Sequence, residues 1–574
     1  MPDLESVIAK SHDASSQLWS WINALDPSDM RKCQLLQEFR MFAQDPPVVT
    51  TSFSGLGTGE AAAVHMHQRA LQVLRSEHVM QVDRDDVLEP RVLCYSATDN
   101  DKLPQKVLML HKEASRPQHL FPDVLCRVNP TLRTTLKDIE QKYMDQREFL
   151  HLECQSGAMT KKELKEEKTL NGNNFCREVS ALLNETEFES HGQCLACQKL
   201  CPISPTFHAS LRERTWIEIA GTTCCPFSSM QRDHDGWLSA STVPCLVWAF
   251  SLRYYSPTVI LHECVQAFTP ETLLASLNMD VNAAVEVPRC PFSGVPSGQC
   301  FELDEWCMQS DVWTPTEFGI PTSGCRRYTR LGGGGVAFLD VSAEEVWGEE
   351  ECLATLDVYL NLRDPDEDRL WERAHTNKQN ANQTSRGMSH LLGSGTFARY
   401  EGHAIKVENA NLMVDDDGLL STTTRVVVNL KHNAKFDTSI YSDHHPRLLK
   451  GSMFWDFTED MTLQSLHKWL CQGFPHPSPY VGLSPDITHF FPFSLEVVSS
   501  VGQAQPSPQQ SSSSSSVSSA KRRRITAPMD QDLFSLSEGQ SSHLLGNSMH
   551  YALASFGFLL AAVTSDKESY RGWI

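Results

Sequence analysis

Residues 216–230 read WIEIAGTTCCPFSSM, and this stretch decides how the rest of the chain is interpreted. Residues 217–220 have the apolar, β-branched bias of a strand, and Gly221 marks a turn. Cys224 and Cys225 therefore follow the carboxyl end of a predicted strand, where open α/β sheets hold their ligands. A thiol in this position can act as a nucleophile if a nearby positive charge lowers its pKa, or the two cysteines can be a buried, inert pair.

The chain has 574 residues, 40% of them apolar and 21% charged, which is long enough for two or three globular domains. It does not open with a basic segment and an apolar run, and no apolar stretch approaches the ~18 residues of a membrane span. We therefore expect a soluble, intracellular protein whose 18 cysteines are reduced thiols. The net charge of −21 excludes a nucleic-acid binder that uses its whole surface, so a polyanion would need a local basic cleft.

Upstream of residue 216, the predicted helices of residues 1–45 are followed by an extended segment and the glycine turn FSGLGTGE at residues 53–60. A strand, a glycine turn and a helix N-terminus together can bind an anionic or nucleotide-like ligand through backbone N–H groups. A second predicted strand leads to Asp99 and Asn100, and Asp123 follows later in the chain, just before Val124. An acid after the second strand is placed to accept hydrogen bonds from a ribose, although each acid could also be a solvated loop residue.

Residues 129–214 interrupt this α/β pattern with a helical apolar stripe and a mixed-charge run, so we interpret them as an insertion. The insertion closes with a C-x2-C-x3-C motif flanked by two histidines, which comprises Cys194, Cys197, Cys201, His191 and His208. This motif could form a zinc site if a fourth ligand converges on it. The second cysteine pair of a stronger zinc motif is missing, and we assign no metal ligand.

After residue 216 the sequence predicts a helix at 244–255 and a strand at 258–262, with Glu263 at its end beside Cys224 if the two strands are neighbours. A glycine-proline turn then leads to Arg326. Short β-like segments at 404–407, 412–414 and 424–430 indicate a separate small domain. Glutamine, proline and serine dominate the later segment 502–540, which we interpret as a disordered linker with a basic run from Lys521 to Arg524.

In this order, the segments resemble motifs of the cytosine-5 DNA methyltransferase family. FSGLG resembles the family's F-x-G-x-G turn, and GTTCCPFS resembles its G-P-P-C-Q-x-F-S motif. ECV at residues 263–265 resembles E-N-V, and FGIPTSGCR at 318–326 resembles part of Y-G-V-P-Q-x-R-x-R. LCQGFP at 470–475 and GNS at 546–548 resemble the two last elements of the family, L-x-G-F-P and G-N-x.

The resemblance implies a Rossmann-like α/β sheet that uses S-adenosylmethionine, with an inserted small β-rich target-recognition domain. It implies N-terminal helices over 1–45, a catalytic core over 46–330 with the insertion at about 129–214, the recognition domain over 335–450, a return to the core over 451–501, the linker over 502–540 and a core helix within 541–574. The implied cofactor-binding residues are Phe53, Ser54, Gly55, Leu56, Gly57, Asp99, Asn100, Asp123, Val124, Asn547 and Ser548. The implied catalytic residues are Cys224 as nucleophile, Glu263 as acid and Arg326 as the group that fixes the base.

The implied reaction is methyl transfer from S-adenosylmethionine to C5 of cytosine in DNA, through a bond between Cys224 and C6 of a flipped-out base. The chain departs from the family at supporting positions, which are Thr222, Thr223, Cys225, Cys264, Thr322 and Gly324. Two alternatives therefore stay open: a weak or inactive methyltransferase fold that binds DNA or chromatin, and a tRNA cytosine-5 methyltransferase. The basic run predicts an import receptor as partner and a nuclear location; otherwise the protein would be cytoplasmic.

Overall fold

The structure is a computed structural model. It describes residues 14–77, 92–228, 235–278, 306–318, 320, 322, 324–333, 336–347, 394–411, 426–430, 453–457, 461–463, 468–469, 471–472, 474, 543–545 and 548–566. Asn547, the basic run 521–524 and the predicted strand 412–414 lie outside these residues.

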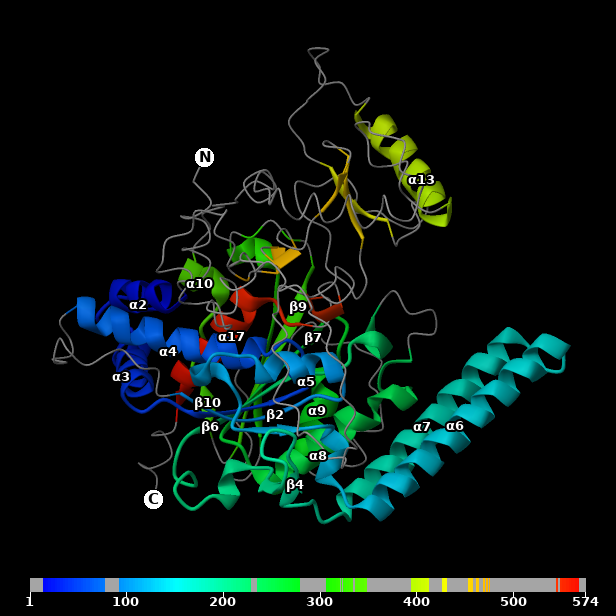
Figure 1. The fold of residues 1–574 in the computed structure, drawn as a ribbon, viewed down its shortest axis with the longest axis horizontal. Helices are drawn as coiled ribbons and strands as arrows, with labels where there is room; N and C mark the ends of the chain where they lie inside the picture. Colours follow the sequence, from blue (N-terminus) through cyan, green and yellow to red (C-terminus); the bar gives the residue numbers. More distant parts are fainter. Residues whose placement is uncertain are drawn as a thin grey trace, which may run out of the picture.

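A seven-stranded sheet forms the centre of the molecule, in the order β3-β2-β1-β6-β7-β9-β8 (Figure 1). The strands are β1 (Val48–Ser52), β2 (Leu93–Thr98), β3 (His119–Phe121), β6 (Trp216–Gly221), β7 (Val259–Val265), β8 (Cys307–Trp313) and β9 (Arg326–Gly332). From β3 to β7 in this order, neighbouring strands are parallel, whereas β9 is antiparallel to both β7 and β8. The predicted α/β class is confirmed, and the turns that follow the parallel strands share one edge of the sheet.

The central strands are buried on both faces, and their side chains alternate between two hydrophobic cores. In β6, Ile217 and Ile219 belong to the first core, whereas Trp216 and Ala220 belong to the second. The helices of the first core are α2 (Ala14–Ala24), α3 (Met30–Gln44), α4 (Thr58–Ser76) and α17 (Tyr551–Val563). The helices of the second are α6 (Pro130–Ser156), α7 (Lys161–Asn184), α8 (Val243–Tyr255) and α9 (Pro270–Leu277). Helices therefore cover both faces of the sheet, and α8 confirms the helix predicted over 244–255.

A buried polar network crosses the middle of this sheet. The carboxylate of Glu218 in β6 accepts hydrogen bonds from Trp248 Nε1 at 2.9 Å and from Ser52 Oγ at 2.5 Å. It also forms an ion pair of 3.4 Å with Arg127, which lies in the 3-10 helix η2 (Val124–Arg127) directly after Asp123. Because both charges are almost fully buried, each depends on its hydrogen-bonded partners to offset the loss of water.

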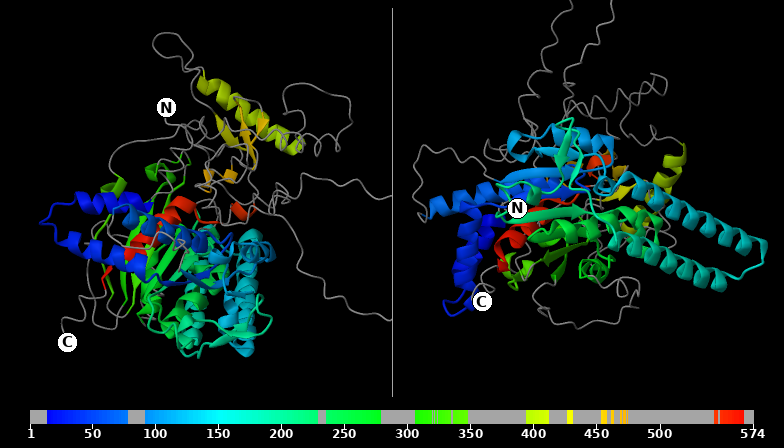
Figure 2. Two further views of the ribbon diagram at one scale, coloured as in Figure 1. Left: turned by 60° about the vertical axis from the view of Figure 1, so that its left-hand side comes forward. Right: turned by 90° about the horizontal axis from the view of Figure 1, so that it is seen from below.

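The insertion is a long helical hairpin, α6 and α7, that projects beyond the sheet (Figures 1 and 2). Thr160 and Glu163 form a capping box at the start of α7, and Tyr143 stacks on Phe175 with ring centroids 4.3 Å apart. The chain returns to the sheet through a small antiparallel hairpin of β4 (His191–Gln193) and β5 (Leu200–Pro202). This hairpin carries the cysteine motif, so the insertion ends next to the main sheet.

A second, smaller sheet contains β11 (Val427–Asn429), β12 (Phe454–Asp456) and β13 (Met461–Thr462), beside α13 (Ser394–Asn411). The strand predicted over 424–430 is thus found in part, but the strand predicted over 404–407 is wrong because those residues belong to α13. Tyr400 and Val407, which are two helical turns apart, pack with Trp455. A four-residue apolar run is too short to distinguish a strand from a buried helix face.

The residues directly after 335 pack with the first hydrophobic core of the main sheet. β10 (Ala337–Phe338) pairs antiparallel with β14 (Ser565–Asp566), which follows α17 at the end of the described chain. The short helix α10 (Ala343–Trp347) joins the first hydrophobic core. None of the helices in the described part of the chain has the length and apolar character to cross a bilayer.

Candidate active site

The candidate nucleophile follows the central strand β6. After Gly221 the chain turns, and Cys224 precedes the short 3-10 helix η4 (Cys225–Phe227), which begins at its neighbour. Cys224 is half-buried and Cys225 is exposed, so the two thiols are not a buried pair. Only the first of them is partly withdrawn from solvent at the strand end.

Glu263 and Arg326 form a close ion pair beside this turn. Glu263 lies in β7 opposite Gly221 in the parallel register, so it lies within the strand rather than after it. Arg326 begins the antiparallel strand β9, and its Nε lies 2.6 Å from Glu263 Oε1. Burial raises the pKa of Glu263, and Arg326 opposes that rise only in part. Glu263 therefore takes up a proton at a higher pH than an exposed glutamate does.

Cys224 lies within electrostatic range of both members of this pair. A hydrogen bond with Cys225 stabilises the protonated thiol and, together with burial, raises the pKa of Cys224 well above its usual value. Arg326 acts in the opposite direction and lowers this pKa. The structure therefore brings the three predicted catalytic residues together, with the thiol held in its protonated form by its neighbour.

We predict that Cys225→Ala will make Cys224 more reactive. Without the hydrogen bond to Cys225, the pKa of Cys224 falls, and each pKa unit corresponds to about a tenfold larger thiolate fraction below the pKa. Iodoacetamide labelling of Cys224 at a series of pH values, read by mass spectrometry, measures this change. Cys33→Ala, at an exposed cysteine, is the control. An unchanged labelling profile for Cys225→Ala would show that the hydrogen bond does not control the thiol.

The residues that depart from the family motifs contact one another around the strand ends. Thr222 Oγ1 lies 2.7 Å from Nε2 of the fully buried His262, whose pKa is lowered to about 3 by burial. Thr222 also forms a side-chain hydrogen bond with Cys264. On the later segment, Thr322 Oγ1 donates to the carbonyl of Cys471 at 2.7 Å. Among the substituted positions, Thr222 and Cys264 therefore contact each other, whereas Thr322 bonds to the backbone of a separate segment.

The glycine turn after β1 is held in an unusual backbone conformation. Phe53, Gly55 and Gly57 all have positive φ, and His111 Nε2 lies 2.9 Å from the carbonyl of Leu56. Ser54 and Leu56 are buried, and the turn leads directly into α4. The five residues predicted to hold a cofactor thus form one tight loop at the carboxyl edge of the sheet.

Gly57→Ala is expected to lower the free energy of unfolding by about 2 kcal/mol or more. Gly57 has a φ of 85°, and a Cβ there would lie 2.4 Å from His111 Cε1 and 2.8 Å from Leu108 Cδ2. Gly157→Ala is a matched control because Gly157 has a φ of 80° but nothing within 4 Å of its Cβ position. Urea unfolding of both variants separates the steric clash from the backbone strain. An equal decrease in the free energy of unfolding of the two variants would contradict a steric role for Gly57.

The predicted acids lie at the ends of β2 and β3. Asp99 Oδ2 accepts a hydrogen bond of 2.8 Å from the backbone N–H of Gly55, so the acid is fixed against the glycine turn. Burial raises the pKa of Asp99. Asn100 is exposed, whereas Asp123 is half-buried and caps η2 by accepting from Leu125 N at 3.0 Å. Val124, the first residue of η2, is buried.

The glycine turn and the two acids follow β1, β2 and β3, Cys224 follows β6, and Glu263 lies near the end of β7. They share one edge of a mixed sheet in which β9 alone runs antiparallel to its neighbours. This is a Rossmann-like α/β sheet, as predicted. In such a fold the cofactor turn and the catalytic turn are neighbours because β1 pairs directly with β6.

The C-terminal segment returns to the same edge of the sheet. Ser548 is buried, and its carbonyl accepts from Gln472 Nε2 at 3.0 Å. A Cβ added at Gly221 would lie 3.1 Å from Met549 Cε and 3.4 Å from Glu263 Oε2. Residues 548–549 therefore approach the catalytic strand ends, whereas the predicted Asn547 lies outside the described residues.

Two groups in this region were missed by sequence reasoning. His543 Nε2 lies 2.6 Å from Asp101 Oδ2, so the C-terminal segment contacts the loop after β2. Glu60, in the first turn of α4, is fully buried, accepts a hydrogen bond from the Thr51 hydroxyl, and has its pKa raised to about 7 by burial. An acid in the first turn of a helix is a common sequence feature, so the pattern alone did not identify Glu60 as part of the candidate site.

No protein-family model matches the sequence, and neither does any curated protein. Among solved structures, the chain is similar to S. pombe Dnmt2 methyltransferase, with a TM-score of 0.32 and 12% identity, covering 90% of this chain and 98% of that one. It is also similar to Entamoeba histolytica methyltransferase EhMeth, with a TM-score of 0.32 and 10% identity, covering 90% of this chain and 97% of that one. Because both TM-scores are low, the fold is assigned from the sheet order and the residues at the strand ends.

Proposed function

We propose that the chain transfers a methyl group from S-adenosylmethionine to C5 of cytosine in DNA. The observation that carries the proposal is the group of Cys224, Glu263 and Arg326, which lies next to the glycine turn on the carboxyl edge of the sheet. A half-buried thiol, a carboxyl group whose pKa is raised and a guanidinium supply the nucleophile, the acid and the positive charge that addition to a cytosine ring uses.

The residues around the glycine turn fit S-adenosylmethionine by their chemistry. Asp99, fixed against Gly55, can accept hydrogen bonds from ribose hydroxyls, and Asp123 at the end of β3 can accept from the amino group of an adenine. Phe53 offers a ring beside the same turn, 6.4 Å from the ring of Trp248. When bound, the cofactor supplies an electrophilic methyl group.

In the proposed reaction, the sulfur of Cys224 forms a bond with C6 of the cytosine, and C5 becomes nucleophilic. Glu263 donates a proton to N3 and holds the exocyclic amine, which offsets the charge that develops on the ring. Arg326 fixes the base and favours the thiolate of Cys224. As C5 takes the methyl group, N3 returns its proton to Glu263. The C5 proton then passes to solvent, the electrons of the C6–S bond return to sulfur as the Cys224 thiolate, and the ring becomes aromatic again.

The target base must leave the duplex to reach Cys224, at a cost of roughly a few kcal/mol. The second sheet is placed to influence this step. Val427 and Phe454, from β11 and β12, share a hydrophobic cluster with Leu56 of the glycine turn and Ala61 of α4. We propose that α13 and β11 belong to the predicted target-recognition domain over residues 335–450, and that β12 and β13, at residues 454–462, complete its sheet.

A duplex that carries 5-fluorocytosine tests the proposal directly, because fluorine at C5 prevents the elimination that releases Cys224. Wild-type protein with S-adenosylmethionine should form a covalent adduct with this DNA, seen as a shifted band in a denaturing gel. Cys224→Ala should form none. Absence of the adduct in wild-type protein that binds the cofactor would contradict the proposed catalysis and favour a DNA- or chromatin-binding role.

The substitutions at the supporting positions, among them Cys225 beside the proposed nucleophile, favour that binding-only alternative. A tRNA substrate is the other alternative. Methyl transfer measured side by side on duplex DNA and on tRNA separates the two substrates, and transfer to tRNA alone would overturn the choice of DNA.

We also propose a nuclear location, with residues 521–524 as the contact for an import receptor. The support is the run of four basic residues inside the serine-rich segment. Replacing all four by alanine in a fluorescent fusion should shift the protein to the cytoplasm. An unchanged distribution would contradict this role.

A further inference from the structure

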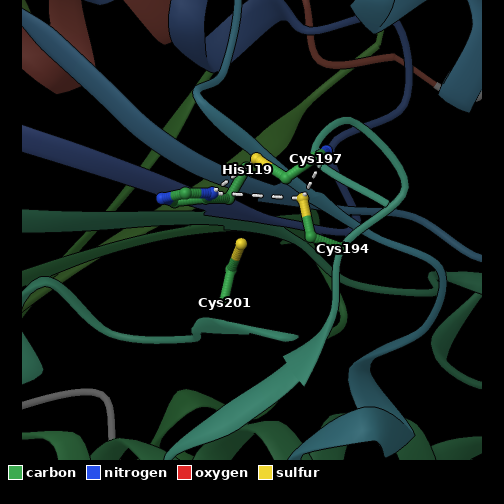
Figure 3. A group of neighbouring side chains, drawn as sticks. All are labelled: His119, Cys194, Cys197 and Cys201. Atoms are coloured by element: carbon green, nitrogen blue, oxygen red, sulfur yellow. Dashed lines mark hydrogen bonds between the residues drawn. The ribbon is translucent and has the colours of Figure 1, made fainter. Parts of the chain in front are cut away.

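Four side chains converge at the edge of the sheet, away from the catalytic group. His119, Cys194, Cys197 and Cys201 each offer one ligand atom, and these atoms all lie within 4.8 Å of one another (Figure 3). His119 belongs to the edge strand β3, whereas the three cysteines belong to the β4–β5 hairpin or its turn. The cluster therefore joins two parts of the chain that are far apart in sequence.

The spacing of these atoms is that of a tetrahedral metal site. Zn–S bonds of about 2.3 Å and Zn–N bonds of about 2.0–2.1 Å place two ligand sulfurs about 3.8 Å apart and a sulfur and a nitrogen about 3.5 Å apart. His119 Nδ1 lies 3.4 Å from Cys197 Sγ and 3.9 Å from Cys194 Sγ. The three cysteines are free thiols rather than a disulfide.

The turn between β4 and β5 already supports Cys194 as a ligand. The backbone N–H groups of Leu120 and Cys197 both donate to Cys194 Sγ, at 3.4 Å and 3.3 Å. Such hydrogen bonds orient a metal-bound thiolate and stabilise its charge. Gln198, with a φ of 57°, turns the chain back so that Cys201 in β5 faces the other two sulfurs. The site is thus formed by backbone geometry as well as by side chains.

The donor set points to zinc. Three thiols and one imidazole form the closed Cys3His combination of structural zinc sites, and soft thiolates disfavour magnesium and calcium. Cys194 and Cys201 are buried, so a bound ion would have no open position for a substrate. We propose that His119, Cys194, Cys197 and Cys201 bind one structural Zn²⁺ ion that fastens the β4–β5 hairpin to β3.

The ion would secure the edge of the sheet beside the candidate cofactor site. The N–H of Leu195 already donates to the carbonyl of Leu120 at 2.7 Å, so the hairpin lies directly along β3. Asp123 follows β3 by two residues. The insertion, whose root is this hairpin, would be attached to the sheet by a metal bond instead of by packing alone.

The fourth ligand is not one of the histidines next to the cysteine motif. His191 and His208 are exposed, and their Nδ1 atoms contact Ser190 Oγ at 3.0 Å and Ser210 Oγ at 2.9 Å. His119 lies far upstream and reaches the cluster only because β3 forms the edge of the sheet. Local spacing could not identify it.

Metal analysis of the purified full-length protein tests the proposal. Wild-type protein produced with added zinc should contain about one zinc ion per chain, and His119→Ala and Cys201→Ser should lose most of it. The double variant H191A/H208A is the matched control and should keep its zinc. Zinc retained by His119→Ala and lost by the control would overturn the choice of ligand.

Cobalt replacement gives a readout that does not depend on whether a variant folds. Wild-type protein reconstituted with Co²⁺ should show the visible absorption of a tetrahedral thiolate site. Wild-type protein with neither zinc nor this absorption would overturn the proposal. A disulfide between Cys194 and Cys197, found by mass spectrometry of protein kept in reducing buffer, would also overturn it. Neither measurement involves methyl transfer, so failure here and failure of the proposed reaction are distinguishable.

Discussion

Cys224→Ala is expected to lower the rate of methyl transfer to cytosine in DNA by roughly 10⁴- to 10⁶-fold, the scale on which enzymes lose activity when their nucleophile is removed. The reason is that C5 becomes nucleophilic only after a thiolate has added to C6. Transfer of labelled methyl groups from S-adenosylmethionine to duplex DNA, at saturating cofactor, measures the loss. Cofactor affinity should be unchanged, because the substitution leaves the glycine turn and its contact with Asp99 in place.

Cys225→Ala is the matched control for this experiment, because it removes the neighbouring thiol and leaves Cys224 in place. It should retain methyl transfer, in keeping with the higher reactivity predicted for Cys224 in that variant. If Cys225→Ala abolished transfer and Cys224→Ala did not, the nucleophile would be the exposed residue and the alignment of the motif would be wrong by one position.

Glu263→Gln is expected to lower kcat by roughly 10²- to 10⁴-fold, the usual contribution of a positioned acid. The glutamine can still donate a hydrogen bond to the base, but it cannot deliver a proton to N3. In the wild type, rising pH increases the fraction of Cys224 present as thiolate, which raises the rate. It also decreases the fraction of Glu263 that is protonated, which lowers the rate. The variant lacks this opposing change, so its residual rate should rise more steeply with pH. A pH series of single-turnover rates measures both effects.

Glu140→Gln is a suitable control for the loss of a carboxyl group whose pKa is raised by partial burial. Glu140 lies on α6, and its pKa is raised by burial in the same direction as that of Glu263. Its replacement should leave kcat and the pH profile unchanged. If Glu263→Gln retained wild-type kcat, the ion pair with Arg326 would be structural and the acid in the reaction would be another group.

The sequence predicted the fold well because the central strands carry unusually clear signals. β6 and β7 are buried on both faces and read as short apolar runs followed by turns, and α8 has continuous apolar character. The strand over 404–407 was wrong because a short apolar run does not distinguish strand from helix. The order of the strands in the sheet could be inferred only from the motifs at their ends.

The residues of the candidate site could be predicted from the sequence where a local motif follows a strand. Contacts between residues that are far apart in the sequence could not be predicted. Cys224, Glu263 and Arg326 each belong to a local motif, and the structure brings them together. In contrast, His119 joins the cysteine cluster, and His543 contacts Asp101, only because the edge strand and the C-terminal segment return to the same region. A single sequence contains no signal for such distant pairs.

The ion pair between Glu218 and Arg127 also restricts which amino-acid substitutions this chain can tolerate. Arg127 follows the candidate adenine contact Asp123, and Glu218 lies in the strand that leads to Cys224, so one buried bond links the two halves of the site. Loss of either partner alone leaves a buried charge uncompensated, at about 3–5 kcal/mol, which is a large share of a domain's stability. Replacing both by apolar residues of matching volume costs far less. We therefore expect a substitution at either position to be tolerated only together with a compensating change at the other.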